Sequence, residues 1–191
     1  MTNRQRLINA ILFFAKNTNY CGKIKLFKLL YLLDFEHFRQ TGKSVTGYDY
    51  QAWKFGPVPV DLMEEWEQLD PDLAQFVHIA PEQVVDYTRL TVKANDGVEF
   101  DDSEFTQRQL RIMTELVDKY RDTMSATMID VTHAQNGAWD KVWQEGRGAH
   151  QPIPYALGIA DDVPEKPILL EVAKELAMCE ASLAVERSAA N

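Results

Sequence analysis

An aspartate and a histidine lie one helical turn apart on an otherwise apolar stretch, and both side chains are of types that bind metals or move protons. They are Asp34 and His37, within KIKLFKLLYLLDFEHFR at residues 23–39. If the fold brought His133 beside them, the three would offer ligands for a divalent ion and support a metal-dependent hydrolase. A structural role is favoured, because a buried Asp34 carboxylate bonded to a Trp or Tyr donor or a backbone amide needs no further ligands. We therefore predict no metal, catalytic or cofactor-binding residue.

A second motif, Thr41-Gly42-Lys43-Ser44, is similar to the end of a phosphate-binding loop. That loop requires a glycine five residues before Gly42, where His37 stands, and it must follow a strand and open a helix. Here the motif follows a predicted helix and opens a predicted strand, which indicates a turn. The sequence also lacks GxSxG, HExxH and the dinucleotide-binding glycine pattern. None of these motifs therefore predicts an enzymatic activity.

Charge is distributed unevenly along the chain. The net charge is −9, yet residues 1–60 hold nine Lys or Arg against three acids. Attraction between the two halves, within one fold or between protomers, is the favoured explanation. The alternative is a helix-turn-helix DNA-binding autoregulator, but a recognition helix exposes a broad polar face. The helix over 23–39 exposes only a narrow polar arc, made of Lys25, Lys28, Glu36 and Arg39, so nucleic acid is not the expected partner.

Length and composition predict one globular domain. The chain has 191 residues, of which 46% are hydrophobic and 26% charged. No run approaches the roughly 20 apolar residues that cross a bilayer, and the first residues fit an amphipathic helix better than a signal peptide. The two cysteines, Cys21 and Cys179, form no CxxC motif. We expect a cytoplasmic protein in a reducing compartment, without a membrane partner.

Hydrophobic periodicity predicts a mainly helical α+β domain with a small antiparallel sheet. Helices are expected at 3–17 (capped by Asn3), 23–39, 60–69, 101 to about 122 (opened by a capping box of Asp101 and Glu104), 125–133 (capped by Ser125), around Trp139 and Trp143, and at 168–183. A strand is expected at 45–55, ended by residues 56–59, and a hairpin is expected to join 84–92 to 98–100 through Asn95-Asp96-Gly97. The helix over 23–39 is apolar around most of its circumference, so it should lie centrally.

The last predicted helix is amphipathic. Its apolar stripe consists of residues at intervals of four, four, three and four positions, namely Ile168, Val172, Leu176, Cys179 and Leu183. We expect this stripe to dock on the body of the protein, on a second copy or on a partner.

Two ordered blocks of residues resemble the Panacea domain of bacterial antitoxins, the group that includes SocA-like and GepA-like phage-associated proteins. The first block resembles K-L-x-K-L-L-Y-x-x-D, G-x-x-x-x-G and A-W-x-x-G-P-V through Lys25, Leu26, Lys28, Leu29, Leu30, Tyr31, Asp34, Gly42, Gly47, Ala52, Trp53, Gly56, Pro57 and Val58. The second resembles M-S-x-x-x-L-x-x-x-T-H-x-x-x-x-W through Met124, Ser125, Thr132, His133 and Trp139, with Ile129 in place of the expected leucine. The blocks place a Panacea-like domain at 5–155 and a helical extension at 156–191.

The resemblance implies a non-enzymatic antitoxin that binds and neutralises a protein toxin encoded beside it, in some relatives as an adaptor that delivers the toxin to a protease. It implies a structural role for Tyr31, Asp34, His133 and Trp139. Residues Lys28, Trp53, Gly56, Pro57 and Val58 are the candidates for toxin contact. A homo-oligomer is a further possible assembly.

Overall fold

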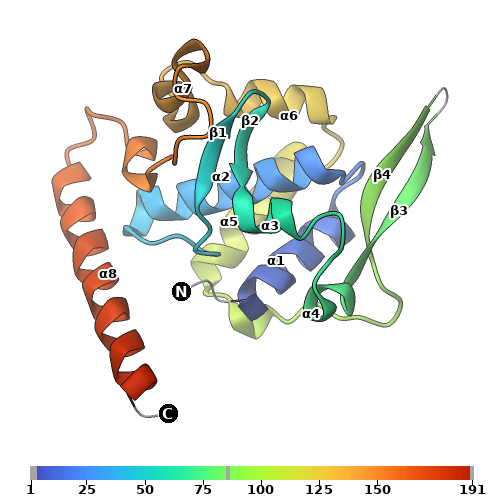
Figure 1. Ribbon diagram of the computed structural model, residues 1–191, viewed down its shortest axis with the longest axis horizontal. Coiled ribbons are helices and arrows are strands. Elements are labelled where there is room, and N and C mark those ends of the chain that lie inside the picture. The colour runs from blue at the N-terminus through green and yellow to red at the C-terminus, as the bar shows by residue number, and fades with distance from the viewer. Residues whose placement is uncertain (1–3, 85–86, 190–191) are drawn as a thin grey trace.

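The computed structural model describes residues 4–84 and 87–189. These residues form eight α-helices, three short 3₁₀ helices and two antiparallel two-stranded sheets (Figure 1). The mainly helical α+β class is thereby confirmed. The predicted cap Asn3 lies outside the described residues.

Helix α2 (Lys23–Thr41) runs through the centre of the molecule, as predicted (Figure 1). It contacts α1 (Arg4–Asn17), α5 (Gln107–Tyr120) and α6 (Ser125–Thr132). A helix with leucine and phenylalanine on most sides gains most when neighbours cover its whole circumference. Helix α2 ends at Gly42, whose φ of 74° is the left-handed conformation that glycine adopts most easily, and whose N–H bonds to the Phe38 carbonyl.

Two lysines of α2 are buried, contrary to the prediction that they line an exposed arc. The Lys25 ammonium donates hydrogen bonds to the carbonyl oxygens of Asn19 (2.6 Å) and Arg121 (2.8 Å). These carbonyls lie just past the ends of α1 and α5, where the helix dipole is negative. Lys25 therefore ties three helices together from the inside. The sequence pattern missed this because carbonyl acceptors from other elements are invisible to helical periodicity.

A tight hairpin of β1 (Tyr50–Trp53) and β2 (Gly56–Pro59) lies against α2. The strands are antiparallel, with Tyr50 opposite Pro59 and Trp53 opposite Gly56. The prediction that residues 56–59 end the strand was wrong, since they form its partner. The other edge of β1 also has partners, because the Ile153 N–H donates to the Tyr50 carbonyl at 2.7 Å. The predicted alternation is confirmed, because Tyr48, Tyr50 and Ala52 are all buried.

The segment after β2 forms two short helices instead of one long one. Helix α3 (Val60–Glu64) is followed by α4 (Pro71–Ala74), so the predicted helix over 60–69 was too long. The chain leaves the helix and places Trp66 edge-on against Phe27, with ring centroids 5.3 Å apart. Burial of a large aromatic ring outweighs the continuation of a single exposed turn.

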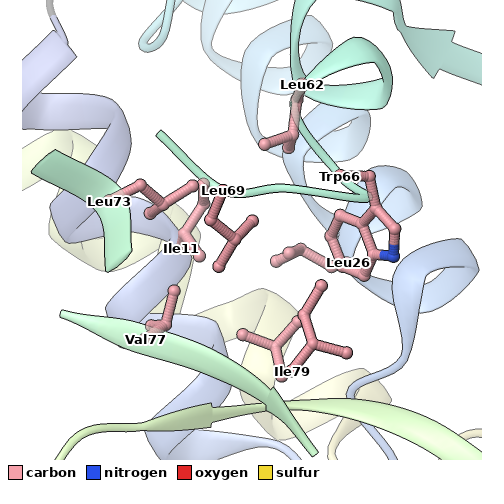
Figure 2. A pocket seen from close by; sticks show the side chains of 9 residues that line it. Ile11, Leu26, Leu62, Trp66, Leu69, Leu73, Val77 and Ile79 are labelled. Atoms are coloured by element: carbon pink, nitrogen blue, oxygen red, sulfur yellow. The ribbon is translucent and has the colours of Figure 1, made fainter. Parts of the chain in front are cut away.

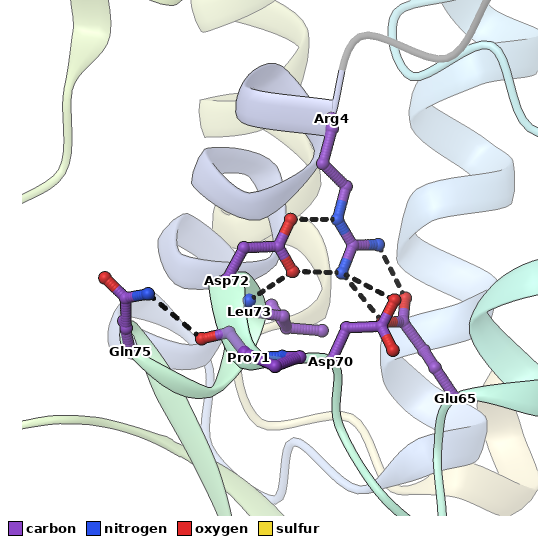
Figure 3. Close-up of polar contacts among 7 residues, drawn as sticks. All are labelled: Arg4, Glu65, Asp70, Pro71, Asp72, Leu73 and Gln75. Carbon is purple, nitrogen blue, oxygen red and sulfur yellow. Dashed lines mark hydrogen bonds and ion pairs between the residues drawn. The ribbon is translucent and has the colours of Figure 1, made fainter.

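The start of α1 is fastened to this segment by one arginine. The Arg4 guanidinium donates two hydrogen bonds to Asp72, at 2.7 and 2.7 Å, and two to Glu65, at 2.7 and 2.8 Å (Figure 3). Further ion pairs join Lys16 to Glu99 and Lys23 to Glu67. Each pair links the basic first 60 residues to the acidic remainder, which is the favoured explanation of the charge asymmetry.

The second sheet is a hairpin of β3 (Val77–Val84) and β4 (Tyr87–Ala94) that extends from the body (Figure 1). The predicted hairpin through Asn95-Asp96-Gly97 was therefore wrong. Asn95 instead closes the base of the hairpin, because its N–H donates to the Phe76 carbonyl and its side-chain amide to the Ala74 carbonyl, both at 2.9 Å.

Helices α5 and α6 confirm two predicted helices but begin differently. The capping box of α5 pairs Thr106 with Gln109, and the predicted pair of Asp101 and Glu104 instead brackets η1 (Asp102–Glu104). Ser125 is the first residue of α6 and does not cap it. Helix α7 (Ala138–Trp143) carries both predicted tryptophans, and η2 (Gln144–Gly146) and η3 (Tyr155–Gly158) follow.

Helix α8 (Lys166–Ala189) stands at the side of the molecule, near the C-terminal end of α2 (Figure 1). The Lys43 ammonium forms an ion pair with Glu180 of this helix. None of the described helices is long and apolar enough to span a bilayer.

Candidate functional site

Asp34 lies at the centre of a buried hydrogen-bond network that joins α2 to the segment before β1. Its Oδ1 accepts from the backbone N–H groups of Val45 and Thr46, both at 2.7 Å. Its Oδ2 accepts from the Tyr50 hydroxyl at 2.7 Å and from the Thr46 hydroxyl. Burial raises the pKa of the carboxyl above its ordinary value, and these hydrogen bonds oppose that shift. The predicted pattern of a buried aspartate with tyrosine and amide donors is present.

The two histidines considered as metal ligands serve other contacts. The His37 Nδ1 bonds to the Lys43 carbonyl at 2.6 Å, and burial lowers the pKa of the ring. His133 stacks face to face on Trp139, with ring centroids 3.7 Å apart. Among residues 4–84 and 87–189, no group of three His, Cys, Asp or Glu is placed to hold a metal ion. The geometry therefore gives no support to a hydrolase built on Asp34, His37 and His133.

Lys28 is enclosed beneath the β1–β2 hairpin. Only 2% of the residue is exposed, and its ammonium donates to the Pro57 carbonyl at 2.8 Å. Burial lowers the pKa of this lysine to about 7. The contact directly joins the first block of family residues, on α2, to the glycine-proline turn.

Gly56 makes room for this lysine. A Cβ at position 56 would lie 2.7 Å from the Lys28 Nζ and 2.9 Å from the Thr132 Oγ1. Its φ of 98° is also a conformation that other residues rarely adopt. Glycine is therefore required twice at this position, once by the backbone and once by the close approach of two side chains.

Trp139 connects α7 to both the hairpin and α2. Its indole N–H donates to the Trp53 carbonyl at 3.0 Å, and its backbone forms a hydrogen bond with the Tyr31 hydroxyl. Its neighbour His133 has a buried Nε2 for which the described residues provide no hydrogen-bond partner. Burial, followed by the nearby charge of Lys28, lowers the pKa of His133.

These contacts bring the two sequence blocks together into one group, which we call the motif cluster. It consists of Lys28, Tyr31, Trp53, Gly56, Pro57, Thr132, His133 and Trp139. Two hydrogen bonds of the cluster cross between elements: Lys28 of α2 donates to Pro57 of the β1–β2 hairpin, and Trp139 of α7 donates to Trp53 of the same hairpin. The cluster holds these elements in register, and it contains no nucleophile paired with a base.

The predicted toxin-contact residues have very different exposures. Gly56, Pro57 and Val58 are buried along with Lys28, and Trp53 is half-buried against the His150 ring. At the tip of the hairpin, the side chain of Phe55 is exposed, a feature that the sequence interpretation missed. The turn between two strands would have indicated it, had β2 been recognised. Direct contact with a toxin stays a prediction for all five residues, of which Trp53 is the most exposed.

An enclosed apolar hollow in the body of the protein gives no support for a ligand site. It is lined only by apolar side chains from α1, α2, the α3–α4 segment and the β3–β4 hairpin, including Ile11, Leu26 and Trp66 (Figure 2). It has no space for a water molecule and no polar group to orient a ligand.

A family model described as "Antitoxin SocA-like, Panacea domain" matches residues 26–140, which is more than half of the chain. The chain belongs to this family. Neither the curated proteins nor the solved structures gave a match. The matched span contains every residue of the motif cluster, which explains why the ordered blocks were recognisable in the sequence.

Proposed function

We propose that this protein is the antitoxin of a bacterial toxin–antitoxin pair and neutralises a protein toxin in the cytoplasm by forming a direct complex with it. The observation that carries the proposal is the family match over residues 26–140. The motif cluster supports it, because these polar residues are occupied in holding helices and hairpin together. Such a scaffold serves binding and does not require catalysis.

The test is co-expression with the product of the adjacent gene, with growth and co-purification scored together. We expect expression of the neighbour alone to arrest growth, and co-expression to restore growth and yield a stable complex. A neighbour that is harmless when expressed alone would contradict the proposal. Rescue without a complex would contradict direct neutralisation; a shortened half-life of the toxin in that case would indicate delivery to a protease.

DNA-binding autoregulation has less support after the burial of Lys25 and Lys28. Both ammonium groups point to carbonyl oxygens inside the protein, and Arg39 at the far end of α2 pairs with Glu36. Helix α2 thus has no basic face for a major groove. Retardation of the promoter DNA that weakens steeply with salt would restore this function.

A further inference from the structure

Most of the predicted apolar stripe of α8 is left uncovered by the body of the protein, and Leu176 is its one half-buried residue. Ile168 is 64% exposed and Leu183 is 52% exposed, and Val172 and Cys179 are also exposed. We call Ile168, Val172, Leu176, Cys179 and Leu183 the α8 stripe. Exposed apolar side chains aligned along more than four helical turns are costly in water and typical of an interaction surface.

A different side of α8 faces the body. Gly42 packs against the Leu169 carbonyl and Ala173, and Lys43 pairs with Glu180. At about 100° per residue, these positions are rotated by roughly 80° from the middle of the α8 stripe. The helix is therefore fastened to the protein by one side, and most of the stripe lies exposed beside that contact.

The outer rim of the α8 stripe is acidic. Glu171, Glu175 and Glu186 are exposed, and helical geometry places them within about 100° of the middle of the stripe, on the side away from the body. Lys174 lies on the opposite side of the helix, about 160° from the middle of the stripe. A groove that accepts this stripe with complementary charge needs an apolar floor and a rim of Lys or Arg.

Pairing with the α8 stripe of a second copy does not provide that chemistry. If two α8 stripes packed together antiparallel about residues 176–179, Glu175 of one copy would meet Glu180 of the other. Parallel packing in register would also bring Glu175 close to Glu180, as in the flanking positions of a coiled coil. Like charges at these positions oppose self-association. Helix α8 also lies outside the family-matched residues 26–140, so its surface is a feature of this chain and not of the shared domain.

We propose that the α8 stripe is a docking surface for the toxin, which binds it in an apolar groove bordered by basic side chains. This inference rests on the proposed antitoxin function, and it names the surface used. This surface differs from the predicted toxin contact at the β1–β2 hairpin. A toxin can reach the exposed side chains of the stripe without a change in the fold, whereas most of the hairpin residues are buried.

The native cysteines provide a direct probe. Cys179 is in the stripe and exposed, whereas Cys21 is buried, so alkylation of the folded chain reports on Cys179. In the complex with the adjacent-gene product, we expect the alkylation rate of Cys179 to fall at least about tenfold relative to the free chain. A matched control places the thiol on the opposite side of the helix with Cys179→Ser and Lys174→Cys. Its alkylation rate should change by less than about twofold on binding.

A substitution tests the energetic role of the stripe. Leu183→Glu should weaken the complex at least about tenfold and reduce growth rescue, whereas Lys174→Glu should change affinity by less than about threefold. The circular dichroism spectra of both variants should match that of the wild type, which checks that the fold is kept.

The outcomes separate this inference from the proposed function. If the wild-type chain forms no complex with a toxic neighbour, both are overturned. If a complex forms but Cys179 stays reactive, or if both thiols are protected equally, only the α8 docking surface is overturned. Protection of Cys179 in the free chain that grows with concentration would assign the stripe to a second copy instead.

Discussion

Helices α2 and α8 both depart from the usual placement of side chains, α2 by burying charged ones and α8 by exposing apolar ones. Helix α2 buries two lysines and an aspartate, and α8 exposes isoleucine, valine, methionine and leucine. In α2 each charge has a partner on another element, such as the Pro57 carbonyl for Lys28. In α8 the exposed residues of the stripe have no such cover in the described part of the chain. The difference shows that the polarity of a side chain does not by itself decide whether it is buried. The contacts available from other elements decide this.

The largest effect is expected where the α2 network is broken. Asp34→Ala leaves the amides of Val45 and Thr46 and the Tyr50 hydroxyl without their acceptor, inside the protein. The free energy of unfolding should fall by roughly 3 to 5 kcal/mol. Urea denaturation measures the loss. Unchanged stability combined with loss of toxin binding would show instead that Asp34 acts in function.

The second effect concerns the space that Gly56 provides for Lys28. Gly56→Ala places a Cβ 2.7 Å from the Lys28 Nζ and imposes a φ of 98° on alanine. We expect a loss of roughly 2 to 4 kcal/mol, measured by thermal and urea denaturation.

A double-mutant cycle with Lys28→Ala separates the two causes. Shortening the lysine removes its part of the steric conflict but leaves the contact with Thr132 and the backbone strain, so the effects of the two changes should not add. Additive effects would show that Lys28 and Gly56 are energetically independent and would contradict the proposed packing.

A third, smaller effect follows from the titration of Lys28. Burial lowers the pKa of this lysine from 10.5 to about 7, so between these values the unfolded chain binds more protons than the folded one. Stability should therefore rise with pH, by about 2 kcal/mol between pH 7 and 9. The thiol of Cys21, whose pKa burial raises from 9.0 to about 11, opposes this rise as the pH approaches 9, and the buried tyrosines, whose pKa values are also raised, act only at higher pH.

The measurement is urea denaturation of the wild type and Lys28→Met at pH 7, 8 and 9. The difference in the free energy of unfolding between the two proteins should change with pH by the amount due to Lys28. The rise with pH that remains in Lys28→Met reports on Lys25, whose pKa is also lowered. Parallel pH profiles for the two proteins would mean that Lys28 is not titrating in this range.

The smallest effect is expected on α8. Leu183 is exposed, so Leu183→Glu should change the free energy of unfolding by less than about 0.5 kcal/mol, despite its large effect on binding. A thermal melt of the free chain tests this. A substantial loss of stability would show that the stripe packs on the body, and the contrast between α2 and α8 would disappear.

Local patterns predicted those elements whose ends and faces depend on nearby residues. The continuous apolar surface of α2 predicted its central place, and alternation predicted that Tyr48, Tyr50 and Ala52 share a buried face. The ordered family residues predicted the motif blocks, and the family match confirms the relationship. Patterns failed where the partner was distant in sequence, as for Asn95, whose bonds to the α4–β3 junction replace the expected hairpin turn.

The sequence by itself determined the helical periodicity, the glycine at position 56 and the residues that would share a face, because these depend on backbone geometry and on neighbours within a few positions. The tertiary structure alone decided that Lys25 and Lys28 lie inside and that the α8 stripe lies outside. A lysine can be buried only if carbonyl oxygens from other segments meet its ammonium, and an apolar stripe stays exposed when the body already holds the adjacent side of its helix. Both conditions are set by long-range packing.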